Sequence, residues 1–337
     1  MKVRSSLSMD IQIDYMHLND IHHAKSIWIE QYRLFASHPD FPIKWKEDTT
    51  LLEQFLQSRI ASKRAYVAKS QGEVVGFLAY DVFDFHGEKS VFCPVIGHGA
   101  QNKSKERVYM ELYRHASAQW VKRSIYNHMW TILYQDEKLR KVLFDLGYGS
   151  YLVDASKRCD SMSNPAVSQW ISEAKLQDRE ILLQLVQESS EYYASAPLFL
   201  QRDKVSEEQM NEYISDGGVF IVWQQDQAAG FIHANISDQD DMINLTLNQS
   251  GSINTLGAYI KPEFRHQRLG KDLLHAAINH VRLLEAEFIH VDFETANLLA
   301  NKFWLKHFTP RLLSLKRNVF KDAIFESMGE SDKTKCW

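Results

Sequence analysis

Ala258-Tyr-Ile-Lys-Pro-Glu-Phe-Arg-His-Gln-Arg-Leu-Gly-Lys-Asp-Leu-Leu274 is the stretch that decides the fold. A short apolar strand ends just before Pro262, a basic loop follows, and Gly270 opens an amphipathic helix. The first amides of a helix have no partner inside it, and the helix dipole is positive at that end. Four basic side chains surround the same point: Lys261, Arg265, Arg268 and Lys271. The segment therefore predicts a site for a phosphate or another anion at the helix start.

The composition limits the classes of protein to consider. With 337 residues, 45% of them apolar, the chain is long enough for two domains with real cores. The net charge of −4 gives no general attraction to nucleic acid or to a membrane. The three cysteines are far apart and form no CxxC, which argues against a disulfide framework or a cysteine zinc site. No apolar run approaches the roughly 20 residues of a membrane span, and we expect a cytoplasmic protein.

The order of predicted elements occurs twice along the chain. Gly76-Phe77 and Gly230-Phe231 each lie in the second strand of a predicted hairpin, 154 positions apart (230 − 76). After each hairpin the pattern predicts a strand, a helix, a strand, a second helix and an apolar strand that ends in basic residues. The predicted strands include 90–96 and 254–260, and the predicted helices include 107–122 and 270–285. A repeat of this length indicates a duplicated domain rather than a solenoid.

The duplication sets the expected domains. We predict one domain at 1–160 and a second at 166–320, separated by the polar stretch Cys159–Pro165, with a C-terminal tail at 321–337. The polar segment 238–252 is expected to form a long hairpin. The predicted fold class is α+β, with two tandem domains that each have a mixed, mostly antiparallel sheet flanked by helices.

Arg265-His-Gln-Arg-Leu-Gly270 resembles the Arg/Gln-x-x-Gly-x-Gly/Ala motif of the GNAT N-acetyltransferase superfamily. Downstream, Asn297-Leu-Leu-Ala300 and Phe303-Trp304 resemble the family's Asn-x-x-Ala-x-x-Phe-Tyr pattern. The resemblance covers roughly 166–318. The first half resembles the same fold more weakly, so the whole chain resembles a tandem GNAT protein.

The resemblance implies a binding site for acetyl-CoA. Backbone amides of the motif loop would hold the pyrophosphate, and this loop consists here of Arg265, His266, Gln267, Arg268, Leu269, Gly270 and Lys271. The strand before the loop would bond the pantetheine arm and polarise the thioester carbonyl, and its residues are Ala258, Tyr259 and Ile260. Asn297 matches the family asparagine near the pantetheine.

Three departures from the family pattern bear on this expectation. Arg268 stands where the family usually has its first glycine, so the backbone site requires the arginine to point outward. Trp304 replaces a tyrosine that often protonates the leaving thiolate, and an indole does not readily give up its proton. His307-Phe308 lacks the expected glycine. In the first half no such motif follows Val95–Lys105, so we expect that half to have lost its CoA site and to shape the substrate pocket or a homodimer surface.

The segment His290-Val-Asp-Phe-Glu294 supplies the candidate catalytic groups. Transfer to an amine requires that the amine lose a proton, and a carboxylate usually assists. In a strand His290, Asp292 and Glu294 share one face. We predict Glu294 or Asp292 as the base; the alternative is a solvated strand end. No metal site is expected, because His275 and His280 do not share a helix face and no HExxH occurs.

The sequence therefore predicts an N-acetyltransferase that moves an acetyl group from acetyl-CoA to a primary amine by direct attack. The acceptor is a small molecule or a peptide, without a nucleic-acid or membrane partner. Two alternatives stay open. One is a non-catalytic acyl-CoA-binding sensor or partner-binding module, and the other is a transferase with a larger acyl donor or a peptide acceptor.

Overall fold

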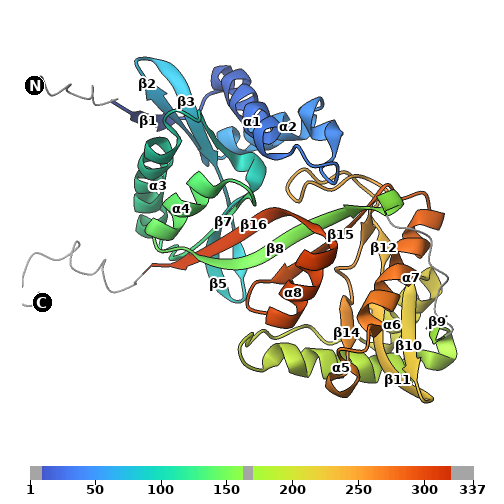
Figure 1. Ribbon diagram of the computed structural model, residues 1–337. Helices are drawn as coiled ribbons and strands as arrows, with labels where there is room; N and C mark the ends of the chain where they lie inside the picture. Colours follow the sequence, from blue (N-terminus) through green and yellow to red (C-terminus); the bar gives the residue numbers. More distant parts are fainter. Residues whose placement is uncertain (1–9, 162–169, 320–337) are drawn as a thin grey trace, which may run out of the picture. The chain divides into compact units, whose positions relative to one another are not determined.

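The computed structural model describes residues 10–161 and 170–319 (Figure 1). The predicted boundary, Cys159–Pro165, and the start of the second predicted domain lie partly outside these residues, and the predicted tail at 321–337 lies wholly outside them.

The helices and strands follow one order in both halves of the chain. In the first half they are β1 (Gln12–Tyr15), α1 (Ile21–Phe35), α2 (Thr50–Ala61), β2 (Ala65–Ser70), β3 (Glu73–Ala79), β4 (Asp81–Phe85), β5 (Glu88–Cys93), β6 (His98–Ala100), α3 (Lys105–Lys122), β7 (Asn127–Leu133), α4 (Glu137–Asp145) and β8 (Gly149–Arg158). In the second half they are β9 (Ile171–Glu173), α5 (Arg179–Ala194), α6 (Glu207–Asp216), β10 (Val219–Gln224), β11 (Gln227–His233), β12 (Asn235–Ile236), β13 (Gly251–Ser252), β14 (Ala258–Ile260), α7 (Leu269–Leu283), β15 (Phe288–Glu294), α8 (Leu298–His307) and β16 (Thr309–Asn318). The predicted α+β class and the duplication are confirmed.

The chain forms two compact units, and each contains a strand from the other sequence half. Among the described residues, unit 1 consists of 10–37, 43–151 and 312–319, and unit 2 of 38–42, 152–161 and 170–311. Within unit 1, β16 pairs with β7; within unit 2, β8 pairs with β15, and both pairs are antiparallel. The last strand of each sequence half therefore completes a sheet of the other unit. The units differ in this respect from the predicted ranges 1–160 and 166–320.

The sheets are mixed and mostly antiparallel. Unit 1 has the strand orders β1-β2-β3-β6 and β16-β7-β5-β4, and unit 2 has β14-β11-β10-β9 and β12-β13-β15-β8. The pairs β5/β7 and β13/β15 are parallel. The polar segment 238–252 connects β12 to its antiparallel partner β13, as the predicted hairpin requires.

The predicted strand 254–260 is interrupted in the structure. β13 pairs with β15, whereas β14 pairs with β11 in a different sheet. Gly257, with φ 77°, lies between them. Positive φ costs glycine little, which lets the chain turn from one sheet to the other at this residue. β14 and β15 therefore diverge, and β14 becomes an edge strand.

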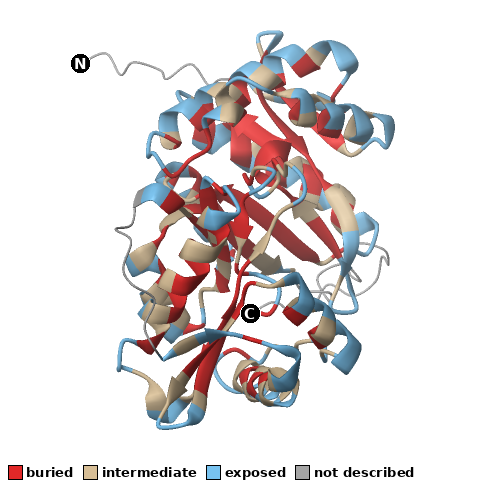
Figure 2. Ribbon diagram, turned by 90° about the vertical axis from the view of Figure 1, so that its right-hand side faces the viewer, coloured by how far each residue is buried: buried red, intermediate tan, exposed pale blue. Residues whose placement is uncertain are grey.

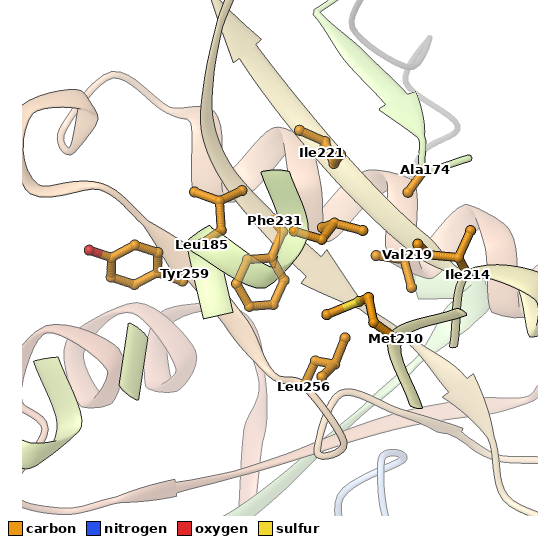
Figure 3. Packing of buried hydrophobic residues seen from close by; sticks show 10 residues of the cluster. Ala174, Leu185, Met210, Ile214, Val219, Ile221, Phe231, Leu256 and Tyr259 are labelled. Atoms are coloured by element: carbon orange, nitrogen blue, oxygen red, sulfur yellow. The ribbon is translucent and has the colours of Figure 1, made fainter. Parts of the chain in front are cut away.

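The core of unit 2 lies between its β11 sheet and two helices. Alternate residues of the strands, including Ile221, Phe231 and Tyr259, face Leu185 of α5 and Met210 of α6. Figure 3 shows Phe231 in the middle of this cluster. The opposite face of β10 meets α7, where Phe220 contacts His280. In Figure 2 the strands are mostly buried and the outer faces of the helices exposed, as expected for sheets covered by helices.

The two Gly-Phe pairs occupy equivalent positions of the duplicated fold. Gly76 pairs with Ala100 of β6, and Gly230 pairs with Ile260 of β14. A Cβ on Gly76 would lie 2.9 Å from the Gly99 carbonyl oxygen, and one on Gly230 would lie 2.2 Å from the Tyr259 carbonyl oxygen. The close approach of the neighbouring backbone explains why glycine stands at both positions.

Candidate functional site

The loop before α7 presents a row of backbone amides. Among the described residues, the N–H groups of His266, Gln267, Arg268, Leu269 and Gly270 meet no acceptor, whereas Lys271 N donates to the Arg268 carbonyl at 2.9 Å. His266 and Arg268 have φ values of 64° and 67°, which turns successive amides toward a common side. Such a turn before a 15-residue helix is a concave donor set for an anion.

Arg268 adopts the left-handed conformation that the family glycine would favour. Its φ of 67° and ψ of −4° cost a non-glycine residue about 1 kcal/mol or more. The Arg268 side chain is exposed. This exposure agrees with a side chain that points outward, and the use of the backbone site stays a prediction.

Two of the four basic residues are held by the protein. The Arg265 guanidinium donates from Nε to the Ile260 carbonyl at 3.0 Å and lies 5.0 Å from the centre of the Tyr192 ring. Lys261 forms an ion pair with Glu188 at 3.1 Å. By contrast, Arg268 and Lys271 are exposed and form no ion pair within the described part of the chain. These two supply the charge that remains available to a ligand.

Gly270 leaves space in front of the loop. A Cβ on Gly270 would meet the ring of Phe303 at 3.6 Å and Ile260 at 4.0 Å, which are ordinary contacts. The fold itself therefore tolerates a small side chain at 270. A glycine here instead allows a ligand to approach the helix backbone closely.

β14 has a free edge next to this loop. Lys261 N donates to the Ala229 carbonyl and His233 N donates to the Gly257 carbonyl, so Tyr259 between them also pairs with β11. The alternate residues, Ala258 and Ile260, turn their backbone groups to the other edge. The Ile260 carbonyl accepts a hydrogen bond from Arg265 Nε. The Ile260 amide and both backbone groups of Ala258 therefore remain available on this edge. Of the three predicted strand residues, the structure therefore assigns the free edge to Ala258 and Ile260.

Asn297 lies buried at the start of α8. Its Oδ1 accepts from the Ala300 amide at 3.3 Å, which caps the helix, and from the Tyr192 hydroxyl at 3.1 Å. Tyr192 also lies against Arg265, as described above. The side chain of Tyr192 thus connects the motif loop with Asn297.

Trp304 and Leu269 are packing residues. Trp304 is 6% exposed and contacts Phe303 and Phe308 with ring centres 4.8 and 5.5 Å away. The Leu269 side chain is also buried. A cofactor would reach the backbone of Leu269 rather than its side chain, and little of the Trp304 ring is accessible.

The carboxylates of β15 lie at the point where β14 and β15 diverge. Ile253 N donates to the His290 carbonyl at 3.1 Å, and the next amide, Asp292 N, donates at 3.0 Å to the side chain of Asn254. Val291 and Phe293 are buried, while His290, Asp292 and Glu294 alternate with them on the other face. His290, Asp292 and Glu294 therefore share one face of β15, as predicted. At Asp292 the backbone pairing with the β13 segment ends, because its amide bonds to a side chain instead.

Asp154 of β8 lies directly opposite Asp292. Cys159 N donates to the Glu287 carbonyl, so the Asp154–Asp292 pair is of the non-hydrogen-bonded kind, in which side chains lie closest. Burial, and then the charge of Glu294, raises the pKa of Asp292 to about 6. Burial, and then the charge of Asp292, raises the pKa of Asp154 to about 8. Two close carboxyls share one proton near neutral pH, because both cannot ionise at low cost.

No sequence motif marks Asp154 or Arg202, and the sequence marks Tyr192 only as one of several aromatic residues that could line a cleft or pack in the core. Arg202 follows α5, and its guanidinium carbon lies 4.7 Å from the centre of the Tyr193 ring. Burial, and then the charge of Glu294, raises the pKa of Tyr193 to about 12, so its phenol stays neutral. These residues come from α5, its following loop and β8, none of which carries a motif.

Unit 1 has different groups at the equivalent positions. The buried His98 on the corresponding edge of β6 is bonded to the Tyr109 hydroxyl and to the Thr131 carbonyl of β7, both at 2.9 Å. At the start of α3, the buried Lys105 ammonium lies 2.5 Å from Asp136, the N-cap of α4. Protein side chains thus occupy this strand edge in unit 1, whereas at the start of α3 the amides of Lys105, Glu106 and Arg107 meet no acceptor among the described residues.

Neither a metal site nor a membrane-spanning helix is found among the described residues. The residues that the structure describes contain no group of three His, Cys, Asp or Glu able to hold a metal ion. Across 10–161 and 170–319 no helix is long and apolar enough to cross a bilayer.

The comparisons with known proteins agree with this geometry. Residues 182–308 match the acetyltransferase (GNAT) family model. No curated protein sequence matches the chain significantly. Among solved structures, a GCN5-related N-acetyltransferase from Sphaerobacter thermophilus is 10% identical, with a TM-score of 0.55 over 91% of this chain and 95% of that chain.

A glucosamine N-acetyltransferase region of a fungal multi-domain β-N-acetylglucosaminidase is 14% identical. Its TM-score is 0.52 over 92% of this chain and 38% of that chain. At such identities the likeness shows the fold alone. The family match identifies residues 182–308 as an acetyltransferase (GNAT) domain, and the repeated order of elements gives the chain the fold of two tandem GNAT-like domains.

Proposed function

We propose that unit 2 binds acetyl-CoA and transfers its acetyl group to a primary amine by direct attack. The observation that carries the proposal is the row of free amides from His266 to Gly270, continuous with the free edge of β14. This arrangement suits an anionic pyrophosphate followed by an amide-containing arm.

The chain's own residues fit the cofactor along its length. The loop amides would hold the pyrophosphate, with Arg268 and Lys271 adding charge from outside. Ala258 and Ile260 would bond the pantetheine from the edge of β14. A free amide on that edge would also polarise the thioester carbonyl, because it is a fixed donor that needs no rearrangement during the reaction.

Asp292 is the base that the geometry favours over Glu294. It lies where β14 and β15 diverge, and a pKa of about 6 leaves it largely ionised at neutral pH. Asp292 takes one proton from the substrate ammonium, and the neutral amine nitrogen then forms a bond to the thioester carbon. The carbon–sulfur bond breaks, the nitrogen releases its second proton, and the sulfur leaves as a thiolate that takes up one proton.

Tyr192 is the phenol that would return this proton. Trp304 is buried and is not an acid, whereas the Tyr192 hydroxyl lies 3.1 Å from Asn297 Oδ1. We propose that Tyr192 serves from α5 where the family tyrosine would serve from α8. Tyr192→Phe should lower kcat without changing the affinity for acetyl-CoA.

Calorimetric titration of acetyl-CoA tests the cofactor proposal. We expect one site per chain, lost by 100-fold or more in Gly270→Glu, since a carboxylate would enter the phosphate site. Gly270→Ala is the matched control for folding, because its Cβ makes only ordinary contacts. Two sites of similar affinity would show that unit 1 also binds the cofactor, and no binding would reject the proposal.

Binding without catalysis is the second candidate, favoured by Arg268 and Trp304 at positions where the family has glycine and tyrosine. In that case the protein is an acyl-CoA sensor or partner-binding module. Release of free CoA thiol in the presence of an amine panel decides between the two. Competition between acetyl-CoA and longer acyl-CoA esters would then identify the preferred donor.

A cytoplasmic reaction accompanies this proposal. The described cysteines, Cys93 and Cys159, are free and buried, as is usual for proteins of a reducing compartment. Homodimer formation stays a prediction, to be checked by light scattering.

A further inference from the structure

A half-buried arginine stands beside the point where β14 and β15 diverge. Arg202, in the segment between α5 and α6, forms no ion pair or hydrogen bond with any residue in the described ranges. A partly buried guanidinium has lost part of its hydration, and the loss is normally offset by a carboxylate. Among the described residues, no carboxylate forms a direct ion pair with Arg202.

The position of Arg202 is fixed by two contacts. Its guanidinium lies over the ring of Tyr193, with a cation–π distance of 4.7 Å. The two terminal nitrogens face Gly257, where a Cβ would lie 3.9 Å from Nη1 and 4.0 Å from Nη2. The forked end of the guanidinium therefore points at the turn just before β14, and glycine leaves space there.

This place is distinct from the phosphate loop. Gly257 precedes β14, whereas the free amides of 266–270 follow it. A cofactor lying along β14 with its pyrophosphate at the loop would bring its acyl end toward Gly257. Arg202 is thus on the side from which an acceptor reaches the thioester.

The charge of Arg202 also affects the pKa of the proposed base, Asp292. Burial and Glu294 raise the pKa of Asp292, and the positive charge of Arg202 acts in the opposite direction. A cation and a carboxylate thus lie near each other at the divergence of the strands. An acceptor with an amine and a carboxylate has the complementary pair of charges.

We propose that the acceptor is an amino acid, whose carboxylate is bound by the Arg202 fork while its amine is presented to Asp292. The inference rests on the proposed function and names its substrate class. Arginine suits this role because its two terminal nitrogens bind both carboxylate oxygens at once. Tyr193 then orients the fork before the substrate arrives.

The test uses matched acceptors with the full-length protein. Each probe set consists of an L-amino acid, its carboxamide and its decarboxylated amine; phenylalanine, phenylalaninamide and phenethylamine form one set. We expect kcat/KM at least 100-fold higher for the amino acid of the preferred set. Sets of α-, β- and γ-amino acids measure the spacing between amine and carboxylate.

Variants of Arg202 separate recognition from general damage. Arg202→Gln should raise KM for the amino acid by at least 50-fold and leave the carboxamide nearly unchanged, so that the two probes become equal. Arg202→Lys should restore part of the preference, because the charge returns without the fork. Lys204→Gln is the control, since it removes an exposed positive charge two residues away and should change nothing.

Each outcome decides the inference. Equal rates for amino acids and decarboxylated amines in the wild type, or equal losses for all probes in Arg202→Gln, would overturn it while leaving acetyl transfer intact. If acetyl-CoA binds but no probe is acetylated, the same amino acids are titrated into the CoA-loaded protein. Binding that depends on Arg202 would then support the carboxylate site and reject catalysis, and no binding would reject both.

Discussion

Two helix starts occupy the same position in the duplicated fold and differ in what surrounds them. At the start of α7 in unit 2, a turn of free amides is followed by Gly270, and the neighbouring N-cap, Asn297, is neutral. At the start of α3 in unit 1, Lys105 is buried against the charged N-cap Asp136. The comparison teaches that both helix starts keep free amides and differ in the charge beside them, with a neutral N-cap next to α7 and a buried ion pair next to α3.

The strand edges differ as well. In unit 1 the His98 ring joins β6 to β7 through Tyr109 and the Thr131 carbonyl. In unit 2 the corresponding edge of β14 keeps Ala258 and the Ile260 amide without backbone partners. The predicted loss of the CoA site in the first half would then have a physical description, since protein groups take the place of a ligand's contacts at this strand edge.

The largest effect should come from breaking the buried ion pair of unit 1. Asp136→Ala leaves the Lys105 ammonium buried without its partner and removes the cap of α4, so we expect a loss of about 3–5 kcal/mol in the free energy of unfolding. Asn297→Ala, the equivalent change in unit 2, removes a neutral cap and the acceptor of the Tyr192 hydroxyl, and should cost about 1–2 kcal/mol. Urea denaturation of both variants measures the difference. Similar losses in the two variants would show that the Lys105–Asp136 ion pair stabilises the protein no more than the neutral cap Asn297 does.

The next effect concerns the base. Asp292→Asn should lower kcat about 10²- to 10³-fold with little change in acetyl-CoA affinity, because only proton removal is affected. Glu294→Gln, on the same strand face, should lower kcat less than 10-fold. Steady-state kinetics with a reactive amine checks both. A larger loss in Glu294→Gln would assign the base to Glu294, and unchanged rates in both variants would reject a carboxylate base on β15.

The shared proton of Asp154 and Asp292 should appear as a pH dependence of stability. Burial and the charge of Asp292 raise the pKa of Asp154 to about 8, far above the value of about 4 for an unfolded aspartate. Between these values the folded state binds more protons than the unfolded state, so stability falls as pH rises and the loss is complete above about pH 8. Asp154→Asn removes this penalty.

The measurement for this pair is thermal unfolding at several pH values. The Tm of Asp154→Asn should match the wild type near pH 4 and exceed it by a few degrees at pH 8. Asp145→Asn, an exposed surface carboxylate of α4, is the control and should show no such trend. A difference that is constant from pH 4 to pH 8 would mean that the two aspartates do not share a proton.

The smallest effect is expected at Arg268. Arg268→Gly relieves the left-handed strain but makes the unfolded chain more flexible, so stability should change by less than about 1 kcal/mol. The same variant loses an exposed cation and should bind acetyl-CoA only about 3-fold more weakly. Titration calorimetry distinguishes this from the opposite case. Tighter binding by the glycine variant would show that Arg268 crowds the phosphate.

Much of the fold could be predicted from local patterns. Periodicity and turn residues, which the sequence shows directly, predict three features. These are the positions of Gly76 and Gly230, the helix after residue 268 and the alternating burial along β15. The interruption of the predicted strand 254–260 was missed, since Gly257 was not interpreted as a turn with positive φ. The exchange of β8 and β16 was missed because strand pairing over such distances has no local signal.

The site was predictable only where a motif exists. The loop from Arg265 to Lys271 follows from its glycine, its basic residues and its place before a helix. Asp154 faces Asp292 across 138 positions of sequence (292 − 154), and only the register of β8 on β15 brings them together. Arg202 follows α5 and acquires its role from the turn at Gly257, so composition and spacing could not identify it.

The exchanged strands determine when the protein can fold during synthesis. β7 of unit 1 has β16 as its antiparallel partner, and the paired residues of β16 begin at Leu312, 179 positions after Leu133 (312 − 133). A ribosome must therefore make all of unit 2 before the first unit can complete its sheet. Until then one edge of β7 is an unpaired edge in a nascent chain, the kind of surface that chaperones cover and that aggregates when left exposed. Because both halves belong to one polypeptide, β16 is already linked to its sheet when it is made, and it needs no encounter with a second chain.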